Sequence, residues 1–241
     1  MRRIAGLALI LALVATPGLA QSLSVDLGSG DGSLATRSIQ LLALVTILSL
    51  VPGLAVMVTC FPFIVTVLSI LRQAIGLPQS PPNMVIVSLA LFLTWFVMEP
   101  VLTEVWQKAV QPMSDGQITV KQAIPLATAP LRGFMAARTD GETFAALQAL
   151  RPDAGRIAAV DAPLSLLVPS FMLSEISRAF EIGFLIYLPF LVIDLVTAAV
   201  LMAMGMMMVP PAVVSLPFKL AFFVVADGWT LISGALVRSY F

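Results

Sequence analysis

The feature that most constrains this chain is a long stretch without charge. No Asp, Glu, Lys or Arg occurs between Arg37 and Arg72, whereas a soluble domain carries about a quarter charged residues. As one helix this stretch would be about 50 Å long, well beyond the ~30 Å hydrocarbon core of a bilayer. Pro52-Gly53 and Pro62 offer breaks. We therefore predict one span over about 39–60, and a second apolar helix or re-entrant segment over about 62–75.

The overall composition places the chain among membrane proteins and excludes several classes of function. Hydrophobic residues make up 59% and charged residues only 11% of the sequence. The 13 basic and 13 acidic residues balance, so no net field recruits nucleic acid. There is no histidine and a single cysteine, Cys60, which excludes histidine-based general-base, metal and haem chemistry and intramolecular disulfides. We expect Cys60 to be a small buried hydrophobe, and no metal or cofactor to be bound.

The N-terminal sequence is typical of a secreted or membrane-inserted precursor. "MRRIAGLALILALVATPGLA" has two arginines, an apolar stretch and small residues at its end. It predicts a cleavable signal peptide over 1–20, ending at Ala20, with Gln21 opening the mature chain; an uncleaved first span is the alternative. The Gly/Ser-rich stretch that follows predicts a flexible external arm over 21–37.

The apolar region over 38–106 predicts an N-terminal hydrophobic helical hairpin region. After the turn in "GLPQSPPN", the next span begins near Asn83 and ends at about Val97 or as late as Trp106. Trp95 and Trp106 suit interfacial depths of a bilayer.

Residues 107–163 have a different composition and predict an external helical segment. In "TDGETFAALQALR", Thr139 and Glu142 have capping-box spacing, and Phe144, Leu147 and Leu150 then share a helical face. We expect a small helical domain that packs its own core.

Residues 164–241 begin with charges at helical spacing and end in an apolar hairpin. Glu175, Arg178 and Glu181 follow each other at i, i+3 spacing, which fits either an ion-paired stripe on one helix or a contact between protomers. The hairpin is expected over about 184–208 and 212–236, joined by Val209-Pro210-Pro211.

Three charged residues lie in the hairpin, and we group them as buried charges with a role in assembly. Asp194 and Asp227 lie about 16 residues on either side of the turn, or ~25 Å along a helix, so both could mark the wet end of the hairpin. Lys219 falls about halfway along the second arm, where an unpaired ammonium is unfavourable. We expect Lys219 to face a protein partner or a water-filled cavity. Counted after signal removal, the topology is N-out, four spans, C-out.

The stretch "VLMAMGMMMVPP" carries an unusual density of methionine. Residues 202–208 hold five of the chain's 12 methionines, and Met206, Met207 and Met208 are consecutive. Consecutive residues on a helix point about 100° apart, so these three can face one axis only if the helix has ended. Gly205 and Pro210 favour such a corner. The candidate pore or gate neighbours of the run are Met202, Met204, Gly205, Pro210 and Pro211.

Two readings of the methionine run follow from its chemistry. Methionine usually fills gaps in a core. However, irregular backbone at membrane depth is tolerated only where it is buried in protein or lines a cavity. A ring of such corners from several copies would form a deformable apolar constriction, which would exclude ions when empty and repack around an unfolded polypeptide when occupied.

Three stretches resemble the FliP family of flagellar biosynthetic membrane proteins. They are "FPFIVTVLSILRQAIGLPQSPPNMVIVSLALFLTWFVMEP", "SFMLSEISRAFEIGFLIYLPFLVIDL" and "VLMAMGMMMVPPAVVSLPFKLAFFVVADGWTLI", and the similarity extends over about 37–241. The resemblance implies a core subunit of the flagellar type III export gate, in the bacterial inner membrane within the basal body and with a periplasmic segment.

What the family implies for structure and partners is specific. The expected fold is all-α and membrane-associated, with helical hairpins that assemble into a helical, pore-forming oligomer of about five copies. The implied partners are FliQ- and FliR-like subunits, FlhB- and FlhA-like export components and unfolded flagellar substrates. Met206, Met207 and Met208 would form a gasket, and Phe134 and Glu175 match protomer contacts.

Two other functions compete with a non-catalytic gate. A small-solute or ion transporter would use Asp194, Lys219 and Asp227 as a charge relay, although the two halves show no internal repeat. An intramembrane hydrolase would need a Ser-Lys or paired-Asp mechanism, for which Asp194 and Asp227 are the only hint.

Overall fold

The computed structural model describes residues 34–77, 79–151, 157–206 and 208–241, and the side chains from residue 38 onward. The predicted cleavage site at Ala20 and Gln21, most of the predicted arm and Met207 lie outside this part of the chain. The chain divides into two units, residues 1–48 and residues 49–241. Both hydrophobic cores lie within the second unit.

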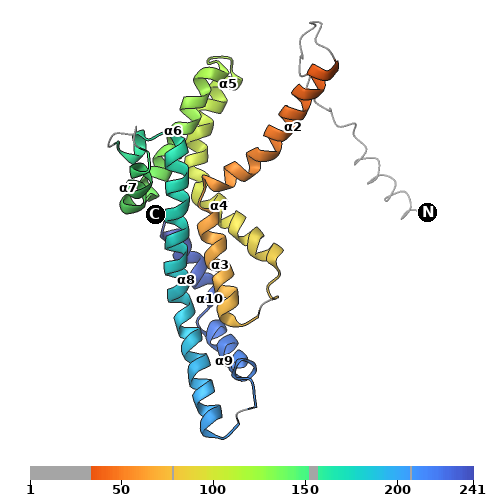
Figure 1. Ribbon diagram of the computed structural model, residues 1–241, viewed down its shortest axis with the longest axis vertical. Helices are drawn as coiled ribbons and strands as arrows, with labels where there is room; N and C mark the ends of the chain where they lie inside the picture. The colour runs from red at the N-terminus through yellow and green to blue at the C-terminus, as the bar shows by residue number, and fades with distance from the viewer. Residues whose placement is uncertain (1–33, 78, 152–156, 207) are drawn as a thin grey trace, which may run out of the picture. The chain divides into compact units, whose positions relative to one another are not determined.

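Throughout the described residues the secondary structure is helical, without a strand, so the predicted all-α class is confirmed. In chain order (Figure 1) the elements are α2 Leu34–Met57, α3 Phe61–Ile75, α4 Asn83–Val105, the π-helix η1 Trp106–Val110, α5 Gln111–Ser114, α6 Val120–Arg138, α7 Gly141–Ala149, the 3₁₀ helix η2 Ala159–Asp161, α8 Leu164–Ala203, α9 Pro211–Val225 and α10 Gly228–Arg238.

Helix α3 forms the centre of the larger core and packs against α8, α4 and α9 (Figure 1). Phe63, Leu68 and Leu71 are fully buried, and burial of each such side chain contributes about 1.5–3 kcal/mol. Cys60, directly before the helix, is also fully buried, as predicted. The helix ends at Gly76, whose φ of 87° lies in the left-handed region that favours glycine. Its bounds agree with the predicted 62–75.

A second core joins α6 and α7 to the first third of α8. Met135 and Phe144 pack with Leu166, Leu167 and Phe171. The segment over 107–163 therefore shares its core with α8, and the prediction that it packs a core of its own is wrong.

The predicted capping box at Thr139 and Glu142 is also wrong. Asp140 is the N-cap of α7 and accepts a hydrogen bond from the Thr143 backbone N–H at 2.8 Å, which lowers the pKa of the Asp140 carboxyl. Thr139 instead ends α6. The shift of one residue arises because Asp caps a helix as well as Thr does, and sequence spacing does not separate the two.

Helix α8 is continuous over 40 residues, or about 60 Å. Pro169 and Pro189 both lie inside it. The sequence predicted the first arm of the hairpin over about 184–208, whereas the helix in the structure begins 20 residues earlier and ends at Ala203.

The second arm of the hairpin is broken, which corrects the single helix expected over 212–236. α9 and α10 meet at an angle of 61°. Asp227 at the break has a φ of 47°, an unusual value for a residue with a side chain. Gly228 follows because the Phe223 ring lies so close that a Cβ there would be 2.1 Å from its Cε2 atom. A larger residue at position 228 would require the Phe223 ring to move.

Three helices are long and apolar enough to cross a membrane within the described chain. They are Ser38–Met57, Asn83–Ser114 and Leu164–Ala203, and the bent α9–α10 pair makes a fourth if it is counted as one span. The described chain therefore has three such helices, or four with the bent pair, against four predicted spans. The in–out orientation of the chain stays a prediction.

Candidate functional site

The methionine-rich loop begins with a Schellman motif at the end of α8. The Met206 N–H donates to the Leu201 carbonyl at 3.0 Å, and the Gly205 N–H donates to the Met202 carbonyl at 3.0 Å. Gly205 has a φ of 77°, which glycine adopts without strain. This motif satisfies the last carbonyls of α8 and turns the chain out of the helix before Met206.

Beyond this turn the methionine side chains no longer follow a helical face. Met208 is 97% exposed, whereas Met206 is 37% exposed. Pro210 is the N-cap of α9 and Pro211 is its first residue, so the irregular stretch is bounded on both sides by residues that end or begin helices.

An apolar hollow of about 550 Å³ lies between the end of α8 and α9. Met204 and Met206 line one end, and Leu201, Val214 and Phe218 line other parts of its wall. Met208 does not line it. Met206 and Met208 thus point to different surroundings, one toward the hairpin and the other away from it.

Lys219 forms a buried ion pair that joins three helices. Its Nζ atom donates to Asp194 Oδ2 on α8 at 2.6 Å and to the Ala74 carbonyl in the last turn of α3 at 3.1 Å. Ser215, one turn before Lys219 on α9, donates to Asp194 Oδ1 at 2.6 Å. Lys219 is only 6% exposed. Its charge is therefore compensated within the chain by a carboxylate and by the negative end of the α3 dipole.

The close packing at this ion pair involves the turn after α3. A Cβ at Gly76 would lie 3.5 Å from Leu216 Cδ1 and 3.8 Å from Lys219 Nζ. The turn after α3 therefore touches α9 directly, and the position of α9 depends on that of α3.

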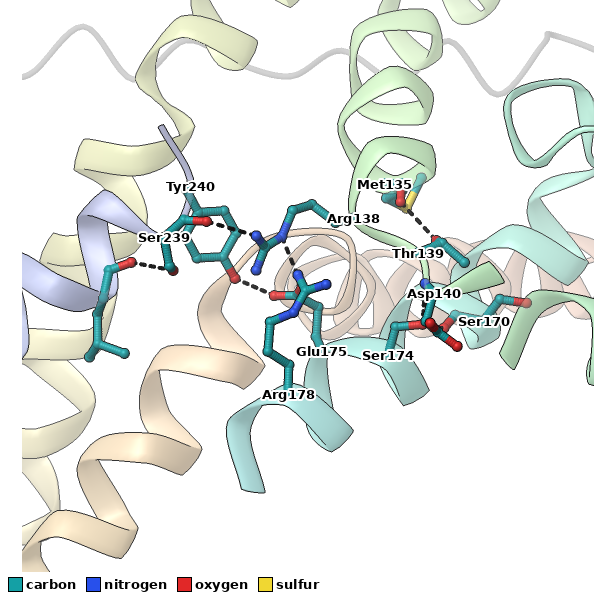
Figure 2. Close-up of polar contacts among 11 residues, drawn as sticks. Met135, Arg138, Thr139, Asp140, Ser170, Ser174, Glu175, Arg178, Ser239 and Tyr240 are labelled. Carbon is teal, nitrogen blue, oxygen red and sulfur yellow. Dashed lines mark hydrogen bonds and ion pairs between the residues drawn. The ribbon is translucent and has the colours of Figure 1, made fainter. Parts of the chain in front are cut away.

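A second buried polar cluster centres on Glu175 of α8 (Figure 2). Glu175 is fully buried and accepts hydrogen bonds from Arg138 Nε at 3.1 Å, from Arg178 Nη1 at 3.5 Å and from the Tyr240 hydroxyl. Arg138 also donates to the Ser239 carbonyl at 2.8 Å. Figure 2 shows these side chains converging from α6, α8 and the C-terminal residues.

Tyr240 is held by aromatic contacts as well. The Arg138 guanidinium carbon lies 4.0 Å from the centre of its ring, and Phe134 stacks on the ring at 6.1 Å between centroids. Burial, and secondarily the Glu175 carboxylate, raises the pKa of Tyr240. The hydroxyl therefore stays protonated and serves as a donor to Glu175.

The structure brings some of the predicted site residues together and separates others. Phe134, Glu175 and Arg178 belong to one cluster, and Glu181 lines a neighbouring polar hollow of about 330 Å³ with Asp140 and Glu142. Asp194 pairs with Lys219, whereas Asp227 lies at the bend between α9 and α10.

Sequence reasoning missed three residues that complete these clusters. Ser215 had a usable signal, because it precedes Lys219 by four residues and shares its helical face. Arg138 and Tyr240 had none, since they lie 37 and 65 residues from Glu175.

No group of three or more His, Cys, Asp or Glu residues within the described residues could hold a metal ion. In both clusters the carboxylate is paired with at least one cationic side chain.

Known proteins match this chain over most of its length. Residues 44–236 match the model of the FliP family. The chain is 47% identical over 234 residues to the flagellar biosynthetic protein FliP of Caulobacter vibrioides, covering 97% of this chain and 88% of the relative. It is 42% identical over 212 residues to the protein of that name from Bacillus subtilis, covering 88% and 96% of the two chains.

Proposed function

Because this chain belongs to the FliP family of flagellar biosynthetic proteins, which are components of the flagellar export apparatus and not enzymes, we propose that it is a gate subunit whose methionine loop closes a protein-conducting channel. In this proposal several copies assemble with FliQ- and FliR-like subunits in the inner membrane, next to FlhB- and FlhA-like components, and unfolded flagellar proteins pass between them.

The observation that carries the proposal is the geometry of the loop. The Schellman turn at Gly205 ends α8 immediately before the methionine run, and Met208 then projects with 97% of its surface exposed. An exposed apolar side chain on irregular backbone between two apolar helices is suited to contact another protein surface. Copies of the loop around an axis would supply that surface to one another.

Such a ring would act through wetting and deformability. An apolar constriction a few ångströms wide expels water and therefore blocks ions without a charged barrier. Methionine has three rotatable bonds and no branch, so the same ring can rearrange around chains of different sequence. Neither property requires catalysis.

The two polar clusters support this function by fixing the frame that carries the loop. The Lys219–Asp194 pair joins the two arms of the hairpin to α3, and the Glu175 cluster joins α8 to α6 and the C-terminus. We propose that Phe134, Glu175 and Arg178 influence protomer contacts by holding the surface around Tyr240 in shape. Glu181, beside them and free to contact a neighbour, would take part directly.

A transporter would need a proton or ion to reach Asp194 and Lys219 in turn. In the structure Lys219 is buried and donates a hydrogen bond to Asp194 and another to the Ala74 carbonyl. Asp194 also accepts a hydrogen bond from Ser215. This compensated arrangement favours a structural pair over a relay, and the gate remains the better supported function.

The test replaces Met206 and Met208 of the loop with alanine in complexes co-expressed with the FliQ- and FliR-like partners. The variant is expected to assemble into the same multi-copy complex, measured by native mass spectrometry, and to conduct small ions in a planar bilayer at rest. Met113→Ala, on the exposed surface of α5, is the matched control and is expected to stay closed. A doubly substituted complex of normal mass that conducts no more than the control would overturn the gasket.

A further inference from the structure

Helix α10 is joined to α9 by a bend with unusual backbone geometry. The two helices meet at 61°, and Asp227 between them has a φ of 47°. A left-handed conformation is unfavourable for a residue with a Cβ atom. Asp227 is also the N-cap of α10, yet its side chain accepts no capping hydrogen bond within this helix, which the structure describes throughout. The bend is therefore held by contacts elsewhere and not by the local preference of residue 227.

The Phe223 ring fills the inner side of this bend. It is 6% exposed and has an edge contact with the Trp229 ring at 5.3 Å between centroids. At Gly228 a Cβ atom would lie 2.1 Å from the Phe223 ring. In a straight helix the side chains of residues 223 and 228 point about 140° apart, so this contact belongs to the bent form alone. A Cβ atom at position 228 thus opposes the bent form and is neutral in a straight one.

The body of α10 packs incompletely on α8. Of its 11 residues, Gly228, Ile232 and Leu236 are the buried ones. A hollow of about 240 Å³ is lined by Ile232 and Leu236 of α10 and by Ile182 and Ile186 of α8. Side chains that face a space of this kind lose dispersion contacts on one side. The interface between the two helices is therefore weaker than a fully packed one.

The last residues of the chain fasten the far end of α10 (Figure 2). Arg138 Nη1 donates to the Ser239 carbonyl at 2.8 Å, and the Tyr240 hydroxyl donates to Glu175. The Tyr240 ring also has an edge contact with Phe63 at 5.6 Å between centroids. These contacts connect the C-terminus to α6, α8 and α3, so α10 is fastened mainly at its end.

We propose that α10 is a latched helix, which turns about Asp227 and Gly228 as a hinge and is held in the bent position by Ser239 and Tyr240. Hinges are a few residues at the ends of elements that absorb a change in φ and ψ, and an unfavourable φ persists only while surrounding contacts impose it. When the latch opens, return of Asp227 to ordinary helical geometry favours a straighter arm.

Release of α10 would change the surface around Glu175. It would remove the Tyr240 donor from this carboxylate and uncover the core that Ile232 and Leu236 cover. Because Phe134 and Glu175 are proposed to influence protomer contacts, the latch would make these contacts depend on the C-terminus of the same subunit. This consequence rests on the proposed function, whereas the hinge and the latch do not.

The test measures the position of α10 in the full-length protein by electron–electron double resonance. Spin labels are attached at Lys121→Cys on α6 and Arg238→Cys on α10, which are exposed positions, while the buried Cys60 is not expected to react. The latched protein is expected to give one narrow distance. Tyr240→Ala is expected to add a second distance and to raise the ratio of released to latched α10 by at least about tenfold, the factor that loss of one hydrogen bond to a charged group gives. Phe241→Ala, at a side chain that is 77% exposed, is the matched control and should keep the single distance.

Gly228→Ala tests the hinge. It is expected to add the same second distance, because the new Cβ atom opposes the bent form. Gly133→Ala on α6, with open space around it, is the control and should keep the single distance. A single unchanged distance in Tyr240→Ala overturns the latch, and a single unchanged distance in Gly228→Ala overturns the hinge.

A second pair of labels separates release of α10 from unfolding. Labels at Lys121→Cys and Gln73→Cys lie outside α10 and should keep their distance in every variant. If this pair also broadens in Tyr240→Ala, the residue holds the whole fold and the latch is overturned.

Native mass spectrometry with the FliQ- and FliR-like partners tests the consequence for assembly. Tyr240→Ala is expected to reduce the fraction of multi-copy complex, and Phe241→Ala is expected to preserve it. A normal copy number in a variant whose α10 is released overturns the link to protomer contacts. The gasket is tested separately by ion conduction of the methionine variant, so failure of one proposal is distinguishable from failure of the other.

Discussion

At the scale of single residues, the buried charges of this chain are compensated in pairs. Lys219 has Asp194 and the α3 carbonyl end, and Glu175 has two arginines and a tyrosine. In each case removal of one partner leaves the other uncompensated in a region of low dielectric, which destabilises more than the pair itself stabilises.

Lys219→Met removes the ammonium group of the buried ion pair. It leaves Asp194 with only Ser215 as a donor, and we expect it to lower the stability of the folded protein by about 1–3 kcal/mol, less than for a fully buried pair because Asp194 is partly exposed. The double variant Lys219→Met/Asp194→Asn should recover most of the loss, since no charge is left unpaired. Thermal unfolding in detergent, followed by tryptophan fluorescence, measures both.

The control for this change is Lys121→Met on the exposed surface of α6, which should be neutral. If Lys219→Met unfolds at the same temperature as this control, the ion pair does not hold the hairpin.

Tyr240→Phe removes the hydroxyl that donates to Glu175 and is expected to destabilise by about 1.5–3 kcal/mol, the range for a hydrogen bond to a charged group. The pH dependence follows from the raised pKa of Tyr240. The contribution of a group with a raised folded-state pKa is fully present below its unfolded pKa of about 10 and is lost as the pH rises above it. Wild type should therefore lose stability above pH ~10 more steeply than the variant.

The other tyrosine supplies the control for this second change. Tyr187 packs against the core on α8, and Tyr187→Phe keeps its ring in place. Parallel alkaline unfolding curves for wild type and Tyr240→Phe would show that the hydroxyl of Tyr240 is not coupled to Glu175.

At the scale of elements, the turn after α8 depends on one glycine. Gly205→Ala places a Cβ at a φ of 77° and is expected to destabilise by about 1 kcal/mol and to raise ion leakage through the assembled gate, because the Schellman turn would no longer close. Gly133→Ala, inside α6 with open space around it, should instead stabilise by about 0.5–1 kcal/mol. The opposite signs, measured by thermal unfolding, separate a conformational requirement from a general effect of added bulk.

The sequence predicts some helix ends and misses others. The corner at the methionine run could be predicted, because Gly205 and Pro210 act locally on the backbone. The break at Asp227 could not, since a residue with a side chain seldom adopts a positive φ and the neighbouring Gly228 is explained only by its contact with Phe223. The full length of α8 was missed because Glu175, Arg178 and Glu181 interrupt the apolar run in the sequence, whereas the helix continues through them.

For the candidate site, the individual charges could be predicted but their partners could not. Lys219 is conspicuous in an apolar stretch, yet Asp194 and Ala74 lie 25 and 145 residues away in the chain. Glu175 likewise meets Tyr240 only after α10 has folded back. Periodicity relates residues within one helix and carries no information about such distances.

At the scale of the whole molecule, the proposed gate separates two kinds of surface. The loop surface is apolar and made of flexible side chains, while the frame behind it holds rigid aromatic and ion-pair contacts. A subunit with this division can let one part rearrange while the other keeps its contacts with neighbours.

The length of α8 determines how far a movement of the frame can displace the methionine loop. About 42 Å of helix separates Glu175, which Arg138 of α6 and Tyr240 hold from outside α8, from the end of the helix at Ala203. The Lys219–Asp194 pair fastens the helix to α9 and α3 along this length, and only about 14 Å of α8 extends beyond Asp194. A bend of 5° at Asp194 would therefore move the end of the helix, where the methionine run begins, by about 1 Å.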